Sequence, residues 1–203
     1  MESNWIEVLK EWQTLLSAML ALMAAAFTIR VMRSQMRQDE ERHKRADERK
    51  KKAIRAQLPD ALSAISGILK RESTKILGND RYGGYPPIEA LNTLKQSIEF
   101  VDDSAAERIF ELVSWYQVWS ARVSHYESRQ SDDILYDTAL LMAYVNSVVD
   151  YAHNKTNVVQ TSKPTQIDME TGLKNAIGLE TFVRKKDDLS DLLDRIKERH
   201  PSD

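Results

Sequence analysis

The stretch that decides the fold is WQTLLSAMLALMAAAFTIRVMRSQMR, residues 12–37, which begins as an apolar run and ends as a basic one. Its first part, residues 12–29, is eighteen consecutive uncharged residues. An α-helix rises about 1.5 Å per residue, so a hydrocarbon core about 30 Å thick needs roughly 20 residues. The run reaches that length if the side chains of Arg30 and Arg33 extend back to the lipid headgroups. We therefore predict a transmembrane helix over residues 12–32.

Two other interpretations of this stretch are a cleaved signal peptide and a buried core helix. A signal peptide carries positive charge before its apolar core, whereas residues 1–29 hold three acidic residues and one lysine. Small residues at 24–26 would suit cleavage, but residues 27–32 continue the helical run without a break. These features favour a retained membrane span.

The flanks of the span predict its orientation. Trp5 and Trp12 lie on the N-terminal side, where indole rings favour the membrane interface, and Arg30 and Arg33 begin a basic flank on the other side. Basic flanks stay in the cytoplasm. We therefore expect these four residues to be the interface anchors, a short extracytoplasmic N-terminus at residues 1–11, and a cytoplasmic C-terminal domain.

The net charge of −2 is the sum of three blocks of alternating sign, −2 over residues 1–29, +6 over residues 30–56 and −6 over residues 57–203. The basic block contains no Gly or Pro and places acidic and basic residues three or four positions apart, which stabilises a helix. We predict a charged helical stalk over residues 33–56, and contact of its first turns with anionic lipid heads is a further interpretation. Its apolar residues form no sustained heptad, so pairing of stalks is only weakly supported. The interleaved acids argue against nucleic-acid binding.

The rest of the chain, residues 57–203, is predicted to be a cytoplasmic bundle of about five or six helices, which makes the fold class all-α. The chain has only 6 Gly and 5 Pro, and its clearest break is GNDRYGGYPP at residues 78–87. Residues 138–149 are uncharged but too few to span a bilayer, so we interpret them as the central core helix. A polar linker at residues 154–166 precedes a final helical segment with an interruption at Gly178.

The sequence contains no recognisable catalytic chemistry. There is no cysteine, and the four histidines are far apart without HxxxH or HExxH spacing, which argues against a metal site. Signatures of phosphate loops, nucleophile elbows and kinases are also absent. We therefore identify no catalytic, cofactor-binding or metal-binding residues, and we do not expect an enzyme.

Two stretches contain candidate partner-binding residues, because tryptophan, tyrosine and arginine are common anchors of interfaces and loop aromatics are often used for contact. They are Trp115, Trp119 and Arg122 in SWYQVWSARV (residues 114–123), and Arg81, Tyr82 and Tyr85 in the glycine-rich loop. Each has a structural alternative. The two tryptophans, four positions apart on one helix face, would also suit the core, and the tyrosines would also seal the loop onto the bundle.

Three segments carry a resemblance to a family: RSQMRQDEERHKRADERKKKAIRAQLPDALSAI after the anchor, then QVWSARV, then VNSVVDYAH. Together with the tryptophan-bearing anchor, they resemble a group of uncharacterised bacterial single-pass membrane-anchored helical proteins. His153 stands where that pattern has arginine. The resemblance implies a location in the bacterial inner membrane, and it implies no activity and no catalytic residues.

The hypothesis that follows is a single-pass inner-membrane protein whose domain binds or scaffolds a partner at the membrane. Its expected partners are the lipid bilayer and another protein, and its oligomeric state is left open. A membrane-bound regulatory or sensory subunit that binds a small ligand is the alternative, and an enzyme of unrecognised type is the third. A phage holin fits the anchor but not the sizeable domain.

Overall fold

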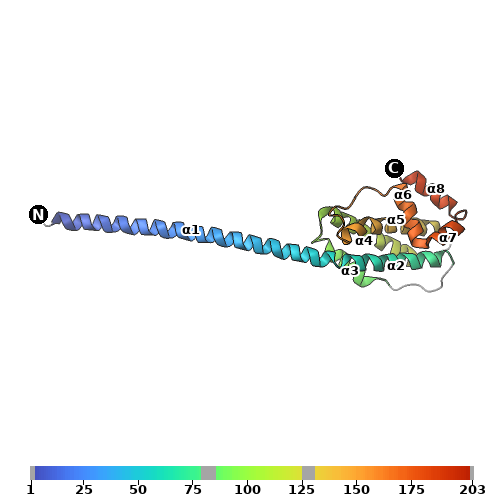
Figure 1. Cartoon of the computed structure of the whole chain (residues 1–203), viewed down its shortest axis with the longest axis horizontal. Helices are drawn as coiled ribbons and strands as arrows, with labels where there is room; N and C mark the ends of the chain where they lie inside the picture. The colour runs from blue at the N-terminus through green and yellow to red at the C-terminus, as the bar shows by residue number, and fades with distance from the viewer. Residues whose placement is uncertain (1–2, 79–85, 125–130, 202–203) are drawn as a thin grey trace. The chain divides into compact units, whose positions relative to one another are not determined.

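The computed structural model consists of helices and connecting loops and describes residues 3–78, 86–124 and 131–201, with side chains from residue 12 onward except residue 14. The chain divides into two compact units, residues 1–49 and residues 50–203. Figure 1 labels the helices in chain order. No strand occurs within the described ranges, so the prediction of an all-α fold is confirmed.

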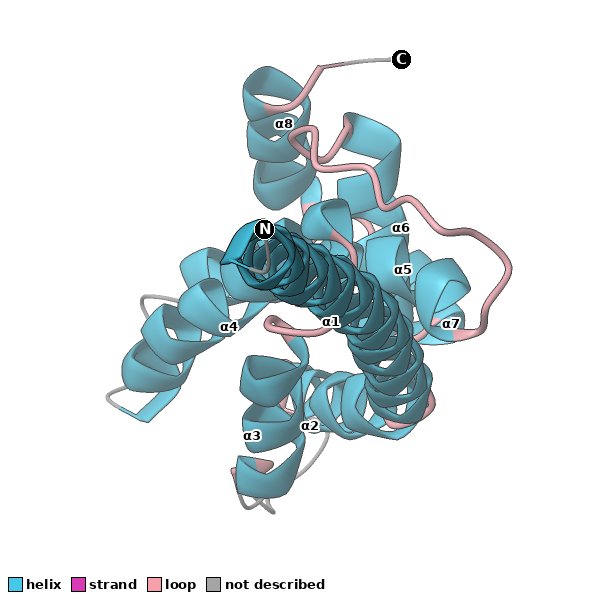
Figure 2. Cartoon of the chain, turned by 90° about the vertical axis from the view of Figure 1, so that its left-hand side faces the viewer, coloured by secondary structure: helices cyan, strands magenta, loops and turns pink. Residues whose placement is uncertain are grey.

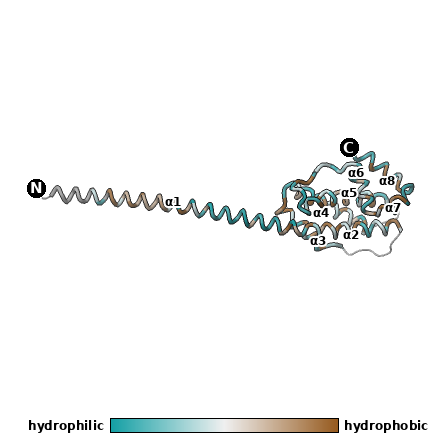
Figure 3. Tube along the Cα trace, viewed as in Figure 1, coloured by the Kyte–Doolittle hydropathy of each residue, from teal (hydrophilic) through white to brown (hydrophobic). Residues whose placement is uncertain are grey.

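The first helix, α1 (Ser3–Arg55), forms because its 53 residues contain no Gly or Pro and are rich in good helix formers. Two ion pairs appear in its charged half at the predicted spacing. Arg45 Nη2 lies 3.2 Å from Glu41 Oε2, and Arg42 Nη1 lies 3.6 Å from Asp39 Oδ1. All four side chains are exposed, so each pair adds only about a few tenths of a kcal/mol. Figure 3 shows the change from hydrophobic to hydrophilic residues along this helix.

The centre of the second unit is α5 (Ser131–Ala152), which packs against α2, α4, α6 and α8. Its residues 137–145 are buried without a break, which explains why this segment lacks the polar face of an ordinary surface helix. The prediction of a central core helix here is confirmed. Figure 2 shows α4 and α6 on different sides of α5.

The other helices of this unit pack against α5 directly or against its neighbours, since α3 contacts α2 and α4, and α7 contacts α6. Their bounds are α2 (Leu58–Ile76), α3 (Ile88–Ser97), α4 (Asp103–Ser124), α6 (Gln166–Ile177), α7 (Leu179–Arg184) and α8 (Ser190–Arg199). The predicted break at Gly178 is present, with a φ of 82° that glycine adopts without strain. A second break, between α7 and α8, was not predicted, so the described part of the domain has more helices than the five or six expected.

A close contact between α6 and α5 depends on Gly172 of α6. A Cβ at this position would overlap the backbone carbonyl oxygen of Ala139 and would lie 3.1 Å from the backbone nitrogen of Ala143. Because both atoms belong to the backbone of α5, they cannot move aside as a flexible side chain would. The small residues on both helices therefore set how closely α6 approaches the core helix.

The second unit begins at Lys50 and includes the last turns of α1. Arg55 is buried, and its Nε donates to the carbonyl oxygen of Tyr151 at 2.7 Å. Lys51 Nζ lies 2.5 Å from Asp102 Oδ1. The hydrogen bond from Lys51 lowers the pKa of Asp102. The end of the predicted stalk is therefore part of the domain's structure.

Candidate functional site

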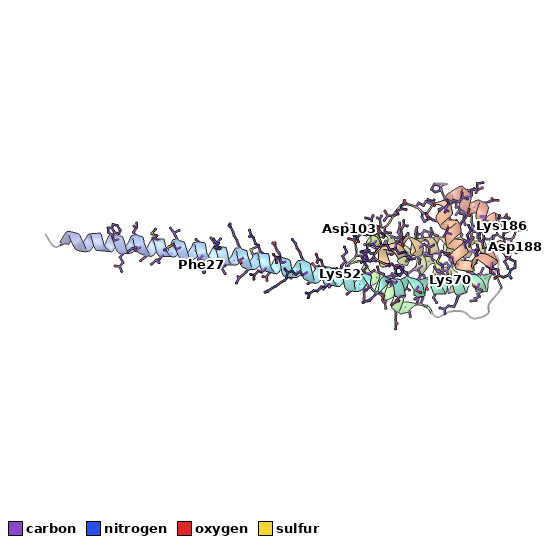
Figure 4. All side chains as sticks on the ribbon, viewed as in Figure 1. Phe27, Lys52, Lys70, Asp103, Lys186 and Asp188 are labelled. Atoms are coloured by element: carbon purple, nitrogen blue, oxygen red, sulfur yellow. The ribbon has the colours of Figure 1, made fainter. Side chains whose placement is uncertain are left out.

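The apolar half of α1 exposes large hydrophobic side chains on all sides. An 18-residue window of this helix has a mean hydropathy of 2.0, and none of it is buried. Phe27, which projects from the helix in Figure 4, is 69% exposed, and Leu22 is 71% exposed. Within the described residues, this is the one helix long and apolar enough to cross a membrane. A helix that packed its apolar face into a core would bury part of this surface.

The basic end of this segment places its arginines on one face. Arg30, Arg33 and Arg37 line a common surface of α1 together with Ser34, as their spacing of three and four residues requires. Trp12 is exposed at the other end of the apolar run. The side chain of Trp5, the remaining predicted anchor, lies outside the described side chains.

A groove of about 580 Å³ on the domain collects polar, charged and aromatic side chains. Its walls come from α4, α5, α8 and the loop before α6, so segments far apart in the sequence converge on it. Helix α4 contributes Trp115 and Arg122, and α5 contributes Asp133, Ile134, Tyr136, Asp137, Leu140 and Tyr144. The remaining lining residues are Lys163, Arg195, Arg199 and His200.

Both carboxylates of the groove are paired with arginine. Arg122 donates to Asp137, while Arg195 Nη1 lies 2.6 Å from Asp133 Oδ1 and Nη2 donates to the carbonyl oxygen of Asp132 at 2.7 Å. Burial raises the pKa of Asp137, and the hydrogen bond from Arg122 opposes that rise. The two arginines therefore neutralise the two acids of the groove.

Tyr136 contacts three other residues of the groove, Arg195, Arg199 and His200. The guanidinium carbons of Arg195 and Arg199 lie 5.0 Å and 5.6 Å from the centre of its ring, within the range of cation–π attraction. Its hydroxyl lies 2.8 Å from His200 Nε2, and His200 Nδ1 lies 2.6 Å from the carbonyl oxygen of Pro164. A carbonyl oxygen only accepts, so Nδ1 carries the proton and Nε2 accepts from the Tyr136 hydroxyl in the neutral ring. Burial lowers the pKa of His200, which favours this neutral form.

The predicted linker before α6 is held against the domain by two buried arginines. Arg108 donates to the carbonyl oxygens of Gln160 and Ser162 at 2.6 Å each. Arg55 donates to the carbonyl oxygen of Thr156. These contacts give the linker a defined path and thereby place Lys163 at the groove, where its Nζ donates to the carbonyl oxygen of Arg199 at 2.7 Å.

The two tryptophans predicted as candidate partner-binding residues, Trp115 and Trp119, lie in different environments. Trp119 is 2% exposed, and its indole Nε1 donates to Thr138 Oγ1 at 2.8 Å, so it belongs to the core. Trp115 is 39% exposed and lines the groove with Arg122. The other three candidates, Arg81, Tyr82 and Tyr85, lie outside the described residues.

Sequence reasoning missed the part of the groove that α8 supplies. It predicted a final helical segment with an interruption at Gly178 and named no candidate binding residue in it. The signal that could have pointed to the groove is the pair Arg195 and Arg199, four residues apart with His200 adjacent. Charge spacing alone does not distinguish such a pair from a solvated face, because both follow the helical repeat.

Comparison of the chain with protein-family models, with curated proteins and with solved structures finds no match. Within the described residues, no group of three or more histidine, aspartate or glutamate side chains is arranged to hold a metal ion. The functional interpretation therefore rests on the exposed apolar helix and the groove.

Proposed function

We propose that the protein is anchored in a membrane by a single helix over residues 12–32 and holds a partner at the membrane surface through its helical domain. The observation that carries the anchor is the exposure of large apolar side chains around α1, none of which is buried across the 18-residue window. Water-exposed apolar surface of this extent is costly, and a bilayer removes the cost at about 25 cal/mol per Å².

The proposed location is the inner membrane of a bacterium, with the N-terminus outside and the domain in the cytoplasm. Two features support this orientation. The flank that begins at Arg30 is strongly basic, and the flank before Trp12 is acidic. The bacterial assignment follows from the resemblance carried by the stalk and by the segment around Arg122.

The groove supports the binding role of the domain. Interfaces and ligand sites commonly combine an exposed aromatic side chain with a few charged or polar groups. Trp115 and Arg122 are arranged in this way beside Tyr136. The convergence of polar groups also favours the second candidate function, a membrane-bound regulatory subunit that binds a small ligand in the same groove.

The anchor is tested by replacing Leu20 and Met23 with arginine in the full chain expressed in bacterial cells. Arginine near the middle of a span costs about 3 kcal/mol per residue for insertion. The unaltered chain should stay in the membrane pellet after an alkaline carbonate wash, and the double variant should be released. The matched control carries Gln38→Arg and Ala46→Arg, which add the same charge to the exposed stalk and should leave the protein in the pellet. Release of the unaltered chain would contradict the anchor.

The orientation is tested separately with reporters fused after Asp203. A reporter active only in the cytoplasm should give signal, and one active only in the periplasm should not. The reverse pattern would contradict the orientation while leaving the anchor intact. A chain with Arg30 and Arg33 replaced by glutamine should show a mixed pattern, because the basic residues nearest the span are the ones that set its direction.

A further inference from the structure

We propose that the groove between α4, α5 and α8 is a binding site for an organic anion, whose carboxylate or phosphate group is held by Lys163 and Arg199. This inference rests on the binding role proposed above and names the chemical class of the ligand. The ligand is either a small molecule or an acidic side chain of a partner, because both present the same oxyanion.

The first argument is the surplus of positive charge in the groove. Four cationic side chains line it against two carboxylates, and each carboxylate is already paired with Arg122 or Arg195. Within the described residues, no carboxylate lies within 4.0 Å of Lys163 or of Arg199, and the buried Nε of Arg195 has no hydrogen-bond partner. Lys163 and Arg199 are thus the two cations of the groove that no carboxylate of the described residues neutralises.

The second argument is that these cations are held in place. Lys163 Nζ donates one hydrogen bond to the carbonyl oxygen of Arg199, which leaves two of its three donors. The Arg199 guanidinium lies over the ring of Tyr136, 5.6 Å from its centre, and the Tyr136 hydroxyl is held by His200. Side chains fixed by such contacts lose less conformational entropy when they bind an anion than free surface lysines do.

The third argument is the contrast between the groove and its surroundings. Residues 57–203 carry a net charge of −6, which opposes the approach of an anion to most of the domain surface. The groove reverses that sign locally. The negative charge of the rest of the domain repels an anion, and the positive charge of the groove attracts it. An anionic ligand is therefore directed to the groove.

The apolar residues of the groove are the reason to expect an organic ligand, with a carbon-containing part attached to the oxyanion. Trp115, Ile134 and Leu140 are apolar or aromatic members of the same groove, and Trp115 is exposed to it. A volume of about 580 Å³ falls within the ~300–1,000 Å³ typical of ligand sites and exceeds what inorganic phosphate alone would fill. The ligand should therefore combine an oxyanion with an aromatic or aliphatic group.

The test is calorimetric titration of the full chain in micelles of an uncharged detergent. Four probes are compared: inorganic phosphate, phenyl phosphate, benzoate and benzyl alcohol. Phenyl phosphate or benzoate should bind more tightly than inorganic phosphate, and benzyl alcohol, which lacks the anion, should not bind measurably. Binding should weaken as salt is raised, because salt screens the exposed cations. A second series uses an acidic peptide with one phenylalanine. Tighter binding of the peptide assigns the anion to a protein partner, and tighter binding of the small probes assigns it to a small molecule.

The variants locate the site. The double variant Lys163→Gln with Arg199→Gln should weaken the binding of phenyl phosphate by at least about tenfold, the effect of losing one charge-assisted hydrogen bond. A second double variant, Lys163→Gln with Arg199→Lys, keeps the charge at position 199 and should bind phenyl phosphate more tightly than the variant with glutamine at both positions. The matched control, Arg184→Gln with Lys186→Gln, removes the same charges from exposed positions at the end of α7 and just after it and should change affinity by less than about twofold.

Three results would overturn the inference. The first is equal binding of benzyl alcohol and phenyl phosphate, the second is anion binding that falls equally in the groove variant and in the control variant, and the third is the absence of anion binding. None of them bears on the membrane anchor, because carbonate extraction measures that property independently. Equal unfolding midpoints of the groove variant and the control variant establish that any loss of affinity is local.

Discussion

Replacing Arg55 with methionine removes a buried side chain that, together with Lys51, connects the end of α1 to the rest of the domain. In the structure its guanidinium donates to the carbonyl oxygens of Tyr151 and Thr156 and to Asn157 Oδ1, the last at 3.0 Å. It also stacks on the Tyr151 ring, with its central carbon 4.0 Å from the ring centre. Methionine keeps most of the apolar stem and leaves the two carbonyl oxygens without these donors.

The magnitude follows from these contacts. A hydrogen bond to a charged group contributes about 1.5–3 kcal/mol. The desolvation cost of the buried guanidinium offsets part of this gain, so the contributions of its hydrogen bonds cannot simply be added. The partners of Arg55 are neutral oxygens, so methionine leaves no unpaired charge but leaves the carbonyl oxygens of Tyr151 and Thr156 without this donor, at about 1–3 kcal/mol each. Since Arg55 is 8% exposed, we expect its loss to lower the free energy of unfolding of the domain by about 3–4 kcal/mol.

The assay is urea unfolding of the full chain in uncharged detergent, followed by near-ultraviolet circular dichroism. This signal reports fixed aromatic side chains such as Trp119. With a slope of about 2 kcal/mol per molar urea, the midpoint should fall by about 1.5–2 M. The matched control is Arg49→Met, an exposed arginine of the same helix, which should change the free energy by less than about 0.5 kcal/mol. If the Arg55 variant unfolds within that margin of the control, the end of α1 does not contribute to the domain as described.

Three further predictions test other parts of the structure by the same unfolding assay. Gly172→Ala should lower the free energy of unfolding by about 1–3 kcal/mol, because its methyl group meets the backbone of α5; Gly67→Ala, inside α2 with nothing within 4 Å of the added atom, should raise it by about 0.5–1 kcal/mol. Similar effects of the two substitutions would contradict the close helix contact. Burial lowers the pKa of His200 from its ordinary value of 6.5, so the folded state binds this proton less readily than the unfolded chain. The associated stability is therefore full above pH 6.5 and decreases as the pH falls below it, and His200→Gln should flatten this part of the profile. Trp119→Ala should cost about 3–5 kcal/mol as a core truncation, whereas Trp115→Ala, at a half-exposed groove position, should cost much less, and equal costs would contradict the assignment of Trp119 to the core.

The sequence predicts well those features that depend on local pattern. The central helix could be located because the uncharged run at residues 138–149 is too short for a membrane and too apolar for a surface helix. The long α1 followed from the absence of Gly and Pro, and the break at Gly178 followed from the conformational freedom of glycine. Each of these depends on residues close together in the chain, where periodicity and helix propensity carry the information.

Features that depend on long-range contact could not be predicted in the same way. Arg55 belongs to a basic run whose pattern predicts a solvated stalk. The burial of Arg55 becomes evident only from its contacts with residues 151–157. The tryptophans at 115 and 119 share the spacing of one helix face, yet one lies in the groove and the other in the core. The groove itself draws on α4, α5, α8 and a loop, and no sequence spacing connects these elements.

The measurement that tests the central claim most directly uses the absence of cysteine from the chain, which makes any introduced thiol unique. Ser17→Cys places it within the proposed span, and Ser190→Cys places it at an exposed position of the domain. In bacterial membranes opened by freezing and thawing, a charged maleimide should label the thiol at position 190 and leave the one at position 17 unreactive until detergent denaturation, because lipid excludes the charged reagent. Labelling of position 17 at the same rate as position 190 in these membranes would contradict a membrane-spanning α1.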